Sequence, residues 1–310
     1  MLRLIARRLF YVAATMLLVS VVLFLLFEVS PETVAANVLG QYSTYEQRLL
    51  CLEQNGYAQP LYRRYLDWLG RLLSGDFGYS RRYRAPVATV LWPRLQASMT
   101  LAAAFFAITV PLSLTLGVLA GMREGSWLDR SISLLSILTT SVPPFASAVL
   151  LTAIFVFALG WLPGTSSMLD GFSWRELVLP VSVLVLYDFG YVARIARGSM
   201  AEVMATPYIR TALLKGVPWP RVVWRHALRN ALIAPFTVIM LQINWLIGGV
   251  IVTEFFFAYK GFGSLILESS LDQDLFMVQA CTLVSVIIAV STQTLADIGY
   301  AFLNPRIRFR

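Results

Sequence analysis

Long uncharged apolar stretches alternate with shorter polar segments along most of the chain. Uncharged runs cover 9–27, 95–122, 131–169, 230–253 and 275–296, and Asp188 interrupts a weaker run at 177–193. A helix needs about 20 predominantly apolar residues to cross a hydrocarbon core of roughly 30 Å. The pattern therefore predicts an all-α fold, a polytopic membrane helical bundle.

The charges between the runs decide how many times the chain crosses the membrane. Pro143 and Pro144 interrupt the long run 131–169, because proline donates no backbone hydrogen bond. With six spans and a cytoplasmic N-terminus, and with the most basic loop counted over 194–229, the inner segments hold fifteen of the 25 Lys and Arg residues. Eight of the other ten lie in the loop 28–96. Inner loops are rich in Lys and Arg, whereas loops longer than about 60 residues escape this rule. Splitting the run 131–169 would place the most basic loop outside, so six spans are favoured.

The predicted order starts with a cytoplasmic N-terminus at 1–8 and ends with a cytoplasmic tail at 299–310. The spans are 9–27, 97–121, 131–160 with a kink at 143–144, 176–196, 231–256 and 275–298. The extracytoplasmic loops are 28–96, 161–175 and 257–274, and the cytoplasmic loops are 122–130 and 197–230. We expect the core transmembrane domain at 95–300.

Composition agrees with lipid as the solvent. Charged residues make up 14% of the chain and hydrophobic residues 58%, whereas soluble domains are roughly a quarter charged. The net charge of +8 does not indicate nucleic-acid binding, because the basic residues flank apolar segments instead of forming one patch. The run after Arg8 is longer than the roughly 7–15 apolar residues of a signal peptide, so it is interpreted as a retained span.

The first outer loop contains an amphipathic segment. Its apolar stripe at helical spacing consists of Leu61, Tyr62, Tyr65, Leu66, Leu69, Leu72 and Leu73. Trp68 adds a residue that is favoured at membrane interfaces. The segment predicts a helix that packs on the outer mouth of the bundle, and contact with a soluble partner is the alternative.

The loop 197–230 has the most informative local signals. Thr206 and Pro207 are typical of a helix start, with Thr206 as N-cap and Pro207 at the first helical position. Gly216 is typical of a C-terminal cap, and Pro218 and Pro220 prevent continuation. A helix of about two turns is expected over Pro207–Lys215, followed by a helix over Arg221–Asn230 that leads into the fifth span.

The sequence contains few residues in the patterns that are typical of catalytic or metal sites. The two lysines, Lys215 and Lys260, follow Leu214 and Tyr259, so the Gly-Lys-Ser/Thr of a phosphate-binding loop is missing and any ATP must bind to another chain. His226 is the sole histidine, which rules out a multi-histidine metal site. Cys51 and Cys281 are interpreted as isolated thiols. We therefore expect that this chain has no enzymatic activity and binds neither a metal nor a cofactor.

Charged groups in apolar spans are costly and mark functional sites. Asp188, Glu254 and Asp297 qualify, although all three are expected toward helix ends, within reach of water or headgroups. Tyr187 and Tyr191 could hold the Asp188 carboxylate by hydrogen bonding. The candidate pathway or gating residues are Pro143, Pro144, Tyr187, Asp188, Tyr191 and Glu254. The Pro143–Pro144 pair either distorts the helix for packing alone or forms a hinge or a kink that lines a cavity.

The inner loop resembles the cytoplasmic signature of bacterial ATP-binding-cassette importer permeases. The general signature is Glu-Ala-Ala, three residues, Gly, nine residues and Ile-x-Leu-Pro; Ala212 and Gly216 fit it, and nine residues separate Gly216 from His226. Arg210, Thr211, His226 and Arg229 depart from it in the way that is typical of the dipeptide and oligopeptide branch.

Other stretches resemble that branch in the same order and spacing over nearly the whole chain. They are 75–80 (GDFGYS), 121–130 with Trp127 and Asp129, 141–145 (SVPPF), 160–163 (GWLP), 260–263 (KGFG) and 304–308 (NPRIR). Lys260 stands where the family usually has proline, so the turn there can differ. The long outer loop resembles that of the first, or B-type, of two paired permeases.

The resemblance implies a type I importer permease fold in the bacterial cytoplasmic membrane. It implies a second homologous permease, two ATPase subunits or domains that bind ATP and Mg, and an extracytoplasmic solute-binding protein. The 207–216 helix would couple the permease to the ATPases. The implied coupling residues are Tyr208, Arg210, Thr211, Ala212, Lys215, Gly216, Arg225, His226, Arg229 and Asn230.

Two alternatives come from other functional classes. An ATP-independent secondary transporter or channel would leave the inner signature unexplained. An intramembrane hydrolase would use Asp188 and Asp297 as paired aspartates. Permeases of the branch that this chain resembles carry di- and oligopeptides, nickel chelates, glutathione, opines, antimicrobial peptides and sugars. Selectivity often resides in the binding protein, so the solute cannot be read from this chain.

Overall fold

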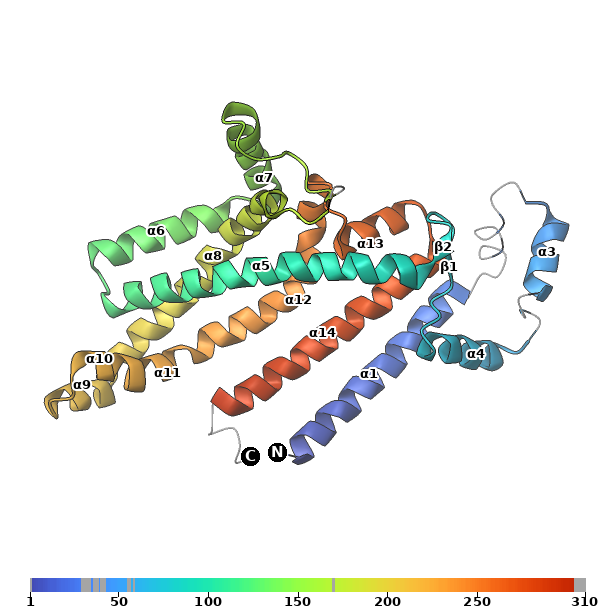
Figure 1. The fold of residues 1–310 in the computed structure, drawn as a ribbon. Helices are drawn as coiled ribbons and strands as arrows, with labels where there is room; N and C mark the ends of the chain where they lie inside the picture. The colour runs from blue at the N-terminus through green and yellow to red at the C-terminus, as the bar shows by residue number, and fades with distance from the viewer. Residues whose placement is uncertain are drawn as a thin grey trace. The chain divides into compact units, whose positions relative to one another are not determined.

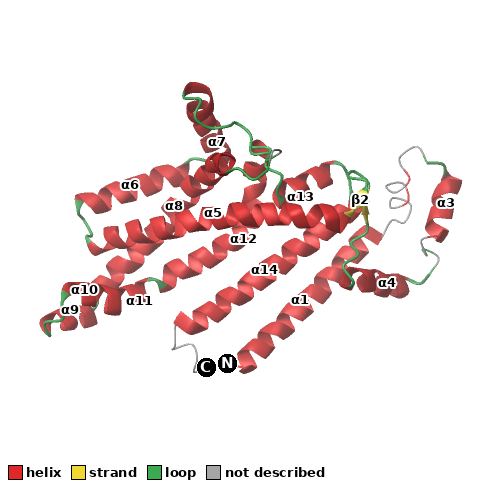
Figure 2. Ribbon diagram, in the orientation of Figure 1, coloured by secondary structure: helices red, strands yellow, loops and turns green. Residues whose placement is uncertain are grey.

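The computed structural model describes residues 2–28, 35, 39, 43–54, 57, 59–168 and 171–303 (Figures 1 and 2). The described residues are mostly helical, as expected, with one short two-stranded hairpin. The chain divides into two compact units, residues 1–98 with 261–291 and residues 99–260 with 292–310. Helices α5 (Val87–Met122) and α14 (Leu275–Leu303) contribute residues to both units.

Helix α8 (Trp174–Met204) is the centre of the second unit. Helices α6 (Trp127–Ser141), α7 (Pro144–Thr152) and α12 (Ile233–Phe256) pack against it. Buried residues recur along α8 from Leu177 to Ala201, as expected for a helix that other helices surround. The helix is longer at both ends than the span expected at 176–196.

Glycines allow α5, α6 and α8 to approach one another closely. A Cβ on Gly117 or Gly121 of α5 would lie 2.5 Å from the carbonyl oxygen of Ala193 or Arg197 in α8. A Cβ on Gly190 of α8 would lie 2.1 Å from the carbonyl oxygen of Ser136 in α6. Small residues at such positions let helix backbones pack tightly inside membranes.

The break expected at Pro143 and Pro144 is confirmed, and it is sharper than a kink. Helix α6 ends at Ser141, Val142 is extended, and α7 begins at Pro144. The segments 127–141 and 144–158 meet at an angle of 97°. Two adjacent prolines remove two backbone donors and force the preceding residue out of the helical region. The second segment ends in a π-helical turn, η1 (Ala153–Ala158).

A group of short helices follows α8. Helix α9 (Pro207–Leu214) confirms the helix expected over Pro207–Lys215. The helix expected over Arg221–Asn230 begins earlier, as α10 (Trp219–Arg221), and continues through a π-helical turn, η2 (Val222–Ala227), into α11 (Leu228–Ala231). The segments 219–231 and 233–243 are bent by 46°.

The first unit contains α1 (Leu2–Glu28), α3 (Tyr45–Gln54), α4 (Leu61–Leu73), the hairpin β1 (Tyr79–Ser80) with β2 (Ala85–Pro86), and α13 (Phe262–Leu271). The amphipathic stripe correctly predicted α4, which packs on α1. The Ser20 hydroxyl lies 2.8 Å from the Tyr65 hydroxyl, and the Phe24 ring contacts Tyr65 and Trp68. Neither the hairpin nor α13 was predicted.

Among the described residues, α5, α8 and residues 275–297 of α14 are long and apolar enough to cross a membrane. The two bent pairs raise this number to five if each is one span. The six-span count stays a prediction. The motif at 304–308, the side chain of Cys51 and parts of the loop 28–96 lie outside the described residues, whereas Cys281 is a buried free thiol.

Candidate functional site

Helix α9 has a backbone capping motif at its C-terminal end and no side-chain cap at its start. Gly216 has φ +77°, its N–H donates to Leu213 O (2.9 Å), and Val217 N–H donates to Ala212 O (3.2 Å). These two bonds form a Schellman motif, which satisfies the last carbonyl groups of the helix. The expected Gly216 cap is therefore confirmed. At the other end Thr206 occupies the N-cap position, but its hydroxyl donates to Val203 O instead of capping the helix.

One face of α9 is buried in an apolar cluster, which we call the α9 base. Its members are Met200, Ile209, Val222, Val223, Ala227 and Ala231. Ile209 is 1% exposed, and Ala212 packs against the cluster from the same helix. Burying an Ile side chain stabilises by about 1.5–3 kcal/mol. The cluster thus joins α9 to α8 and to the η2 turn.

The π-helical turn η2 orients the second half of the signature. Val222, Val223 and Ala227 face the α9 base, whereas Trp224 and Arg225 are exposed. His226 is half-buried, and its carbonyl oxygen accepts a hydrogen bond from the Asn230 amide (3.1 Å). π-helical turns recur at functional sites, because they change which side chains share a face.

The structure brings three of the predicted coupling residues together, namely Tyr208, His226 and Asn230. The Asn230 amide also donates to the Tyr208 hydroxyl (3.1 Å), which links α9 to α11 beside His226. Ala212 lies on the same short helix as Tyr208 and faces the base. Arg210 and Thr211 are exposed on α9, and Lys215 is exposed at its C-cap. Arg225 and Arg229 are exposed on η2 and α11.

Sequence reasoning missed an apolar contribution to the exposed face of α9. Leu214 is 82% exposed and Leu213 40% exposed. Leu214 follows Arg210 by four positions, so both lie on the side opposite Ile209. A helical projection centred on Ile209 would have identified it. An exposed leucine flanked by basic side chains is suited to contact another protein.

The candidate pathway residues are placed differently from expectation. Asp188 lies near the middle of α8 and is 2% exposed, so the expectation of a position near a helix end is wrong. Its carboxylate accepts a hydrogen bond from the Gln242 amide of α12, a residue that sequence reasoning did not consider. Tyr187 is half-buried, and Tyr191 is 42% exposed.

Glu254 and the proline pair lie elsewhere in the second unit. Glu254 is in the last turn of α12, as expected, but it is 0% exposed within the chain. Pro143 is exposed and Pro144 half-buried at the α6–α7 break. The sequences of α8 and α12 do not show this burial, since it depends on how neighbouring helices pack.

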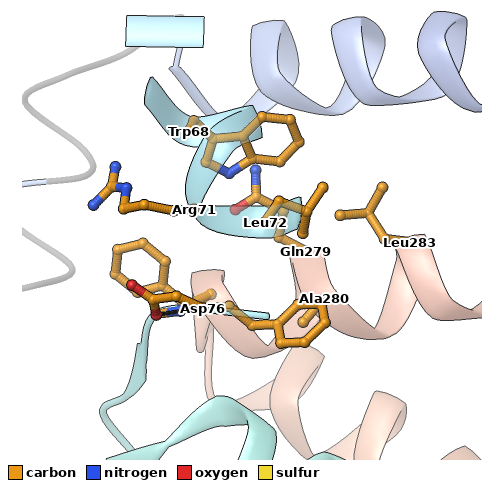
Figure 3. A pocket seen from close by; sticks show the side chains of 10 residues that line it. Trp68, Arg71, Leu72, Asp76, Gln279, Ala280 and Leu283 are labelled. Carbon is orange, nitrogen blue, oxygen red and sulfur yellow. Dashed lines mark hydrogen bonds between the residues drawn. The ribbon is translucent and has the colours of Figure 1, made fainter. Parts of the chain in front are cut away.

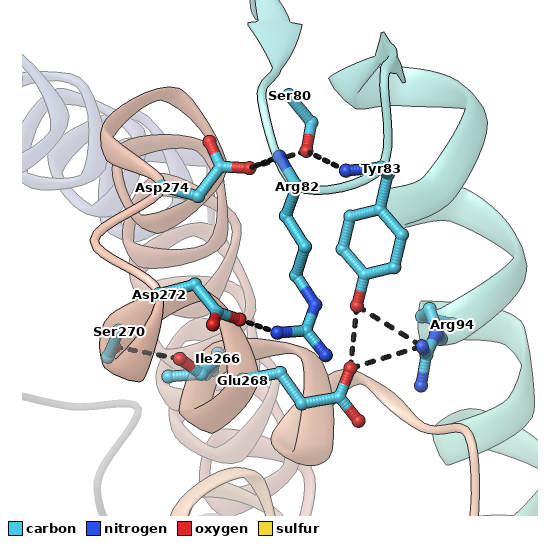
Figure 4. Close-up of polar contacts among 9 residues, drawn as sticks. All are labelled: Ser80, Arg82, Tyr83, Arg94, Ile266, Glu268, Ser270, Asp272 and Asp274. Carbon is cyan, nitrogen blue, oxygen red and sulfur yellow. Dashed lines mark hydrogen bonds and ion pairs between the residues drawn. The ribbon is translucent and has the colours of Figure 1, made fainter. Parts of the chain in front are cut away.

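The first unit contains a set of polar contacts that we call the hairpin network (Figure 4). It joins the hairpin and α5 to α13 and the residues after it through Ser80, Arg82, Tyr83, Arg94, Glu268, Asp272 and Asp274. The Tyr83 hydroxyl donates to Glu268 Oε2 (2.6 Å), which also accepts from Arg94 Nη2 (3.4 Å). Burial and the hydrogen bond to Glu268 raise the pKa of Tyr83.

The 75–80 motif lies beside this network and has its own conformational requirement. Gly78 has φ +86°, and a Cβ there would lie 2.9 Å from the Phe276 ring. The adjoining pocket lies between Trp68, Arg71 and Leu72 of α4 and Gln279, Ala280 and Leu283 of α14 (Figure 3). Its volume is about 40 Å³, far below the roughly 300 Å³ of small-molecule pockets. It is therefore a packing gap and not a solute site.

Comparison with known proteins agrees with the signature. Residues 113–309 match the model of the binding-protein-dependent transport system inner membrane component, and residues 1–113 match the corresponding N-terminal family. The chain belongs to this permease family. It is the membrane component of an ABC importer.

Full-length relatives of this permease carry consistent names. A peptide transport system permease protein of Brucella abortus (strain 2308) is 37% identical over 99% of both chains. A peptide ABC transporter permease protein of Sinorhizobium fredii is 32% identical over 98% of this permease and 99% of the relative. The glutathione transport system permease protein of Escherichia coli K12 is 32% identical over 100% of both chains.

Proposed function

We propose that this permease forms half of a translocation pathway for short peptides or related small solutes. A second homologous permease forms the other half, and a solute-binding protein delivers the solute at the extracytoplasmic face. Two ATPase subunits or domains bind ATP and Mg and dock on α9 from the cytoplasm. Six spans in the bacterial inner membrane place both termini in the cytoplasm.

The observation that carries this proposal is the construction of α9. One face packs on the α9 base through Ile209, which is 1% exposed, and the other presents Arg210, Thr211 and Leu214. A two-turn helix with a Schellman motif and a packed face transmits a displacement that a mobile loop would absorb. Charge alone, as a device to orient the protein in the membrane, would not require the buried isoleucine or the Gly216 turn.

The proposed solute class rests on the relatives. Their names state peptide transport and glutathione transport, and glutathione is itself a tripeptide. Uptake of radiolabelled Ala-Ala and glutathione by the complete complex with its binding protein would test this class. Import of neither, together with import of a sugar or a metal chelate, would contradict it.

The docking proposal is tested by Arg210→Glu and Gly216→Pro in the reconstituted complex. Charge reversal opposes the partner surface, and proline cannot adopt the φ of +77° at Gly216. We expect normal membrane insertion but at least about tenfold less ATP-driven uptake, the effect of losing about 1.4 kcal/mol of coupling. Arg63→Glu, at an exposed arginine of α4, is the matched control and should transport normally. Transport at the parent's rate by both α9 variants would refute the docking assignment.

A further inference from the structure

Asp129 and Arg197 form an ion pair between two helices of the second unit. Arg197 Nε lies 2.9 Å from Asp129 Oδ1, and Arg197 Nη2 lies 2.7 Å from Asp129 Oδ2. Asp129 is in the first turn of α6 and is 3% exposed, and Arg197 is in α8. Two parallel charge-assisted bonds fix both distance and orientation, which a single bond does not.

The same carboxylate also holds the loop between α5 and α6. Gly125 N–H donates to Asp129 Oδ2 (2.9 Å), and the Ser133 hydroxyl donates to Asp129 Oδ1 (3.4 Å). Asp129 N–H in turn donates to Ser126 Oγ (3.2 Å), which caps α6. Asp129 therefore joins the loop, the start of α6 and α8 at one point, and its two oxygens accept all four donated bonds.

Packed contacts connect this point to α9. Met200 follows Arg197 by three positions, nearly one helical turn, and belongs to the α9 base together with Ile209. Gly121 of α5 lies directly against Arg197 and Met200, because a Cβ there would be 2.5 Å from Arg197 O and 2.7 Å from Met200 Cβ. The route from α9 through α8 to α6 is thus continuous.

From these contacts we propose that the Asp129–Arg197 pair is a positioning element that makes α6 follow α8 and α9 during the ATPase cycle. The proposal rests on the proposed docking of ATPases at α9. Displacement of α9 reaches α8 through the α9 base, and the bidentate pair passes it to α6, which leads into the α6–α7 break. Without the pair, α9 and α8 move while the inner end of α6 lags behind, so ATP is hydrolysed with less solute moved.

The test compares two acids that contact the same guanidinium. Glu124 also lies 3.4 Å from Arg197 Nη2, but its side chain is 62% exposed, so its contribution should be small. In the complete complex in proteoliposomes, Asp129→Asn should retain ATP hydrolysis while solute imported per ATP falls at least about fivefold, the lower end of typical coupling energies. Glu124→Gln should match the parent. Arg197→Lys, which keeps the charge but loses the bidentate geometry, should lie between them.

A solute-independent readout separates positioning from general stability. Spin labels at Arg130→Cys on α6 and Glu202→Cys on α8, both exposed, report the distance between the two helices in a Cys51→Ser background. In the parent this distance should stay constant when the ATPases bind ATP, and in Asp129→Asn it should change. If Asp129→Asn fails to fold, Arg197→Lys carries both measurements.

Two outcomes would overturn the proposal. One is an unchanged ratio of import to ATP hydrolysis in folded Asp129→Asn and Arg197→Lys complexes. The other is an inter-label distance that stays constant in both variants. Normal transport by both Arg210→Glu and Gly216→Pro would instead refute docking at α9, whatever the Asp129 variants do, so the two failures are distinguishable.

Discussion

The α9 base and the hairpin network hold their regions together by different physical means. The α9 base consists of apolar side chains, among them Ile209 and Met200. The hairpin network consists of carboxylates, guanidinium groups and hydroxyls, with Glu268 accepting from both Tyr83 and Arg94. Close packing depends on the shapes of the side chains, whereas these polar contacts depend on the protonation state of their groups. Stability is therefore expected to depend on packing in one region and also on pH in the other.

The close packing of α8 on α6, in the same unit as the α9 base, predicts the largest effect. Gly190→Ala would place a Cβ 2.1 Å from Ser136 O and 2.5 Å from Thr140 Oγ1, so α6 and α8 must separate. We expect no accumulation of folded protein, or a loss of unfolding free energy beyond the about 1–3 kcal/mol that overpacking typically costs, because the added Cβ meets the backbone oxygen of Ser136. Gly198→Ala, in the same helix with nothing within 4 Å of the added Cβ, should stabilise slightly, by about 0.5–1 kcal/mol. Thermal unfolding in detergent compares them, and equal shifts would contradict the packing account.

The two faces of α9 predict an intermediate effect that separates folding from docking. Ile209→Ala should lower the unfolding free energy by about 2–4 kcal/mol, because it leaves a cavity in the α9 base. Leu214→Ala should leave stability within about 0.5 kcal/mol, because Leu214 is 82% exposed. Both variants should transport less solute. A loss of thermal stability in Leu214→Ala, or none in Ile209→Ala, would reverse the assignment of the faces.

The hairpin network predicts the smallest effect and a dependence on pH that the α9 base lacks. Tyr83→Phe removes the hydrogen bond to Glu268 and should cost about 1 kcal/mol at neutral pH. Because burial and this bond raise the pKa of Tyr83, the neutral phenol is favoured in the folded state. Its contribution is complete below the unfolded pKa of about 10 and is lost as the pH rises through the higher folded pKa.

Unfolding measured between pH 8 and 11 compares these two regions directly. The stability difference between the parent and Tyr83→Phe should shrink toward the alkaline end, whereas the Ile209→Ala deficit should stay constant. A Tyr83→Phe difference that grows with pH would show that the phenol is not held in its neutral form.

The sequence predicted those features that depend on local chemistry. Apolar spacing identified α4, Pro207 and Gly216 marked the limits of α9, and Pro143–Pro144 marked the break after α6. Each of these signals acts within one or two helical turns, where capping, proline geometry and periodicity decide the structure.

Contacts between distant residues could not be predicted in this way. Asp188 and its partner Gln242 are 54 positions apart in the sequence, and Asp129 and Arg197 are 68 positions apart. Periodicity places such residues on a face but does not identify the partner face. The π-helical turn η2 also has no known local signal in its residues, so Trp224 and Arg225 could not be assigned to the exposed side before the structure was described.

Photo-crosslinking from α9 in native membranes tests the central claim most directly. A photoreactive amino acid replaces Leu214, on the exposed face of α9, or Tyr62, which is 63% exposed on α4. Docking at α9 predicts a crosslink to the ATPase subunit from position 214 and none from position 62. Absence of an ATPase crosslink from position 214 in a complex that still transports, or an equal crosslink from position 62, would contradict it.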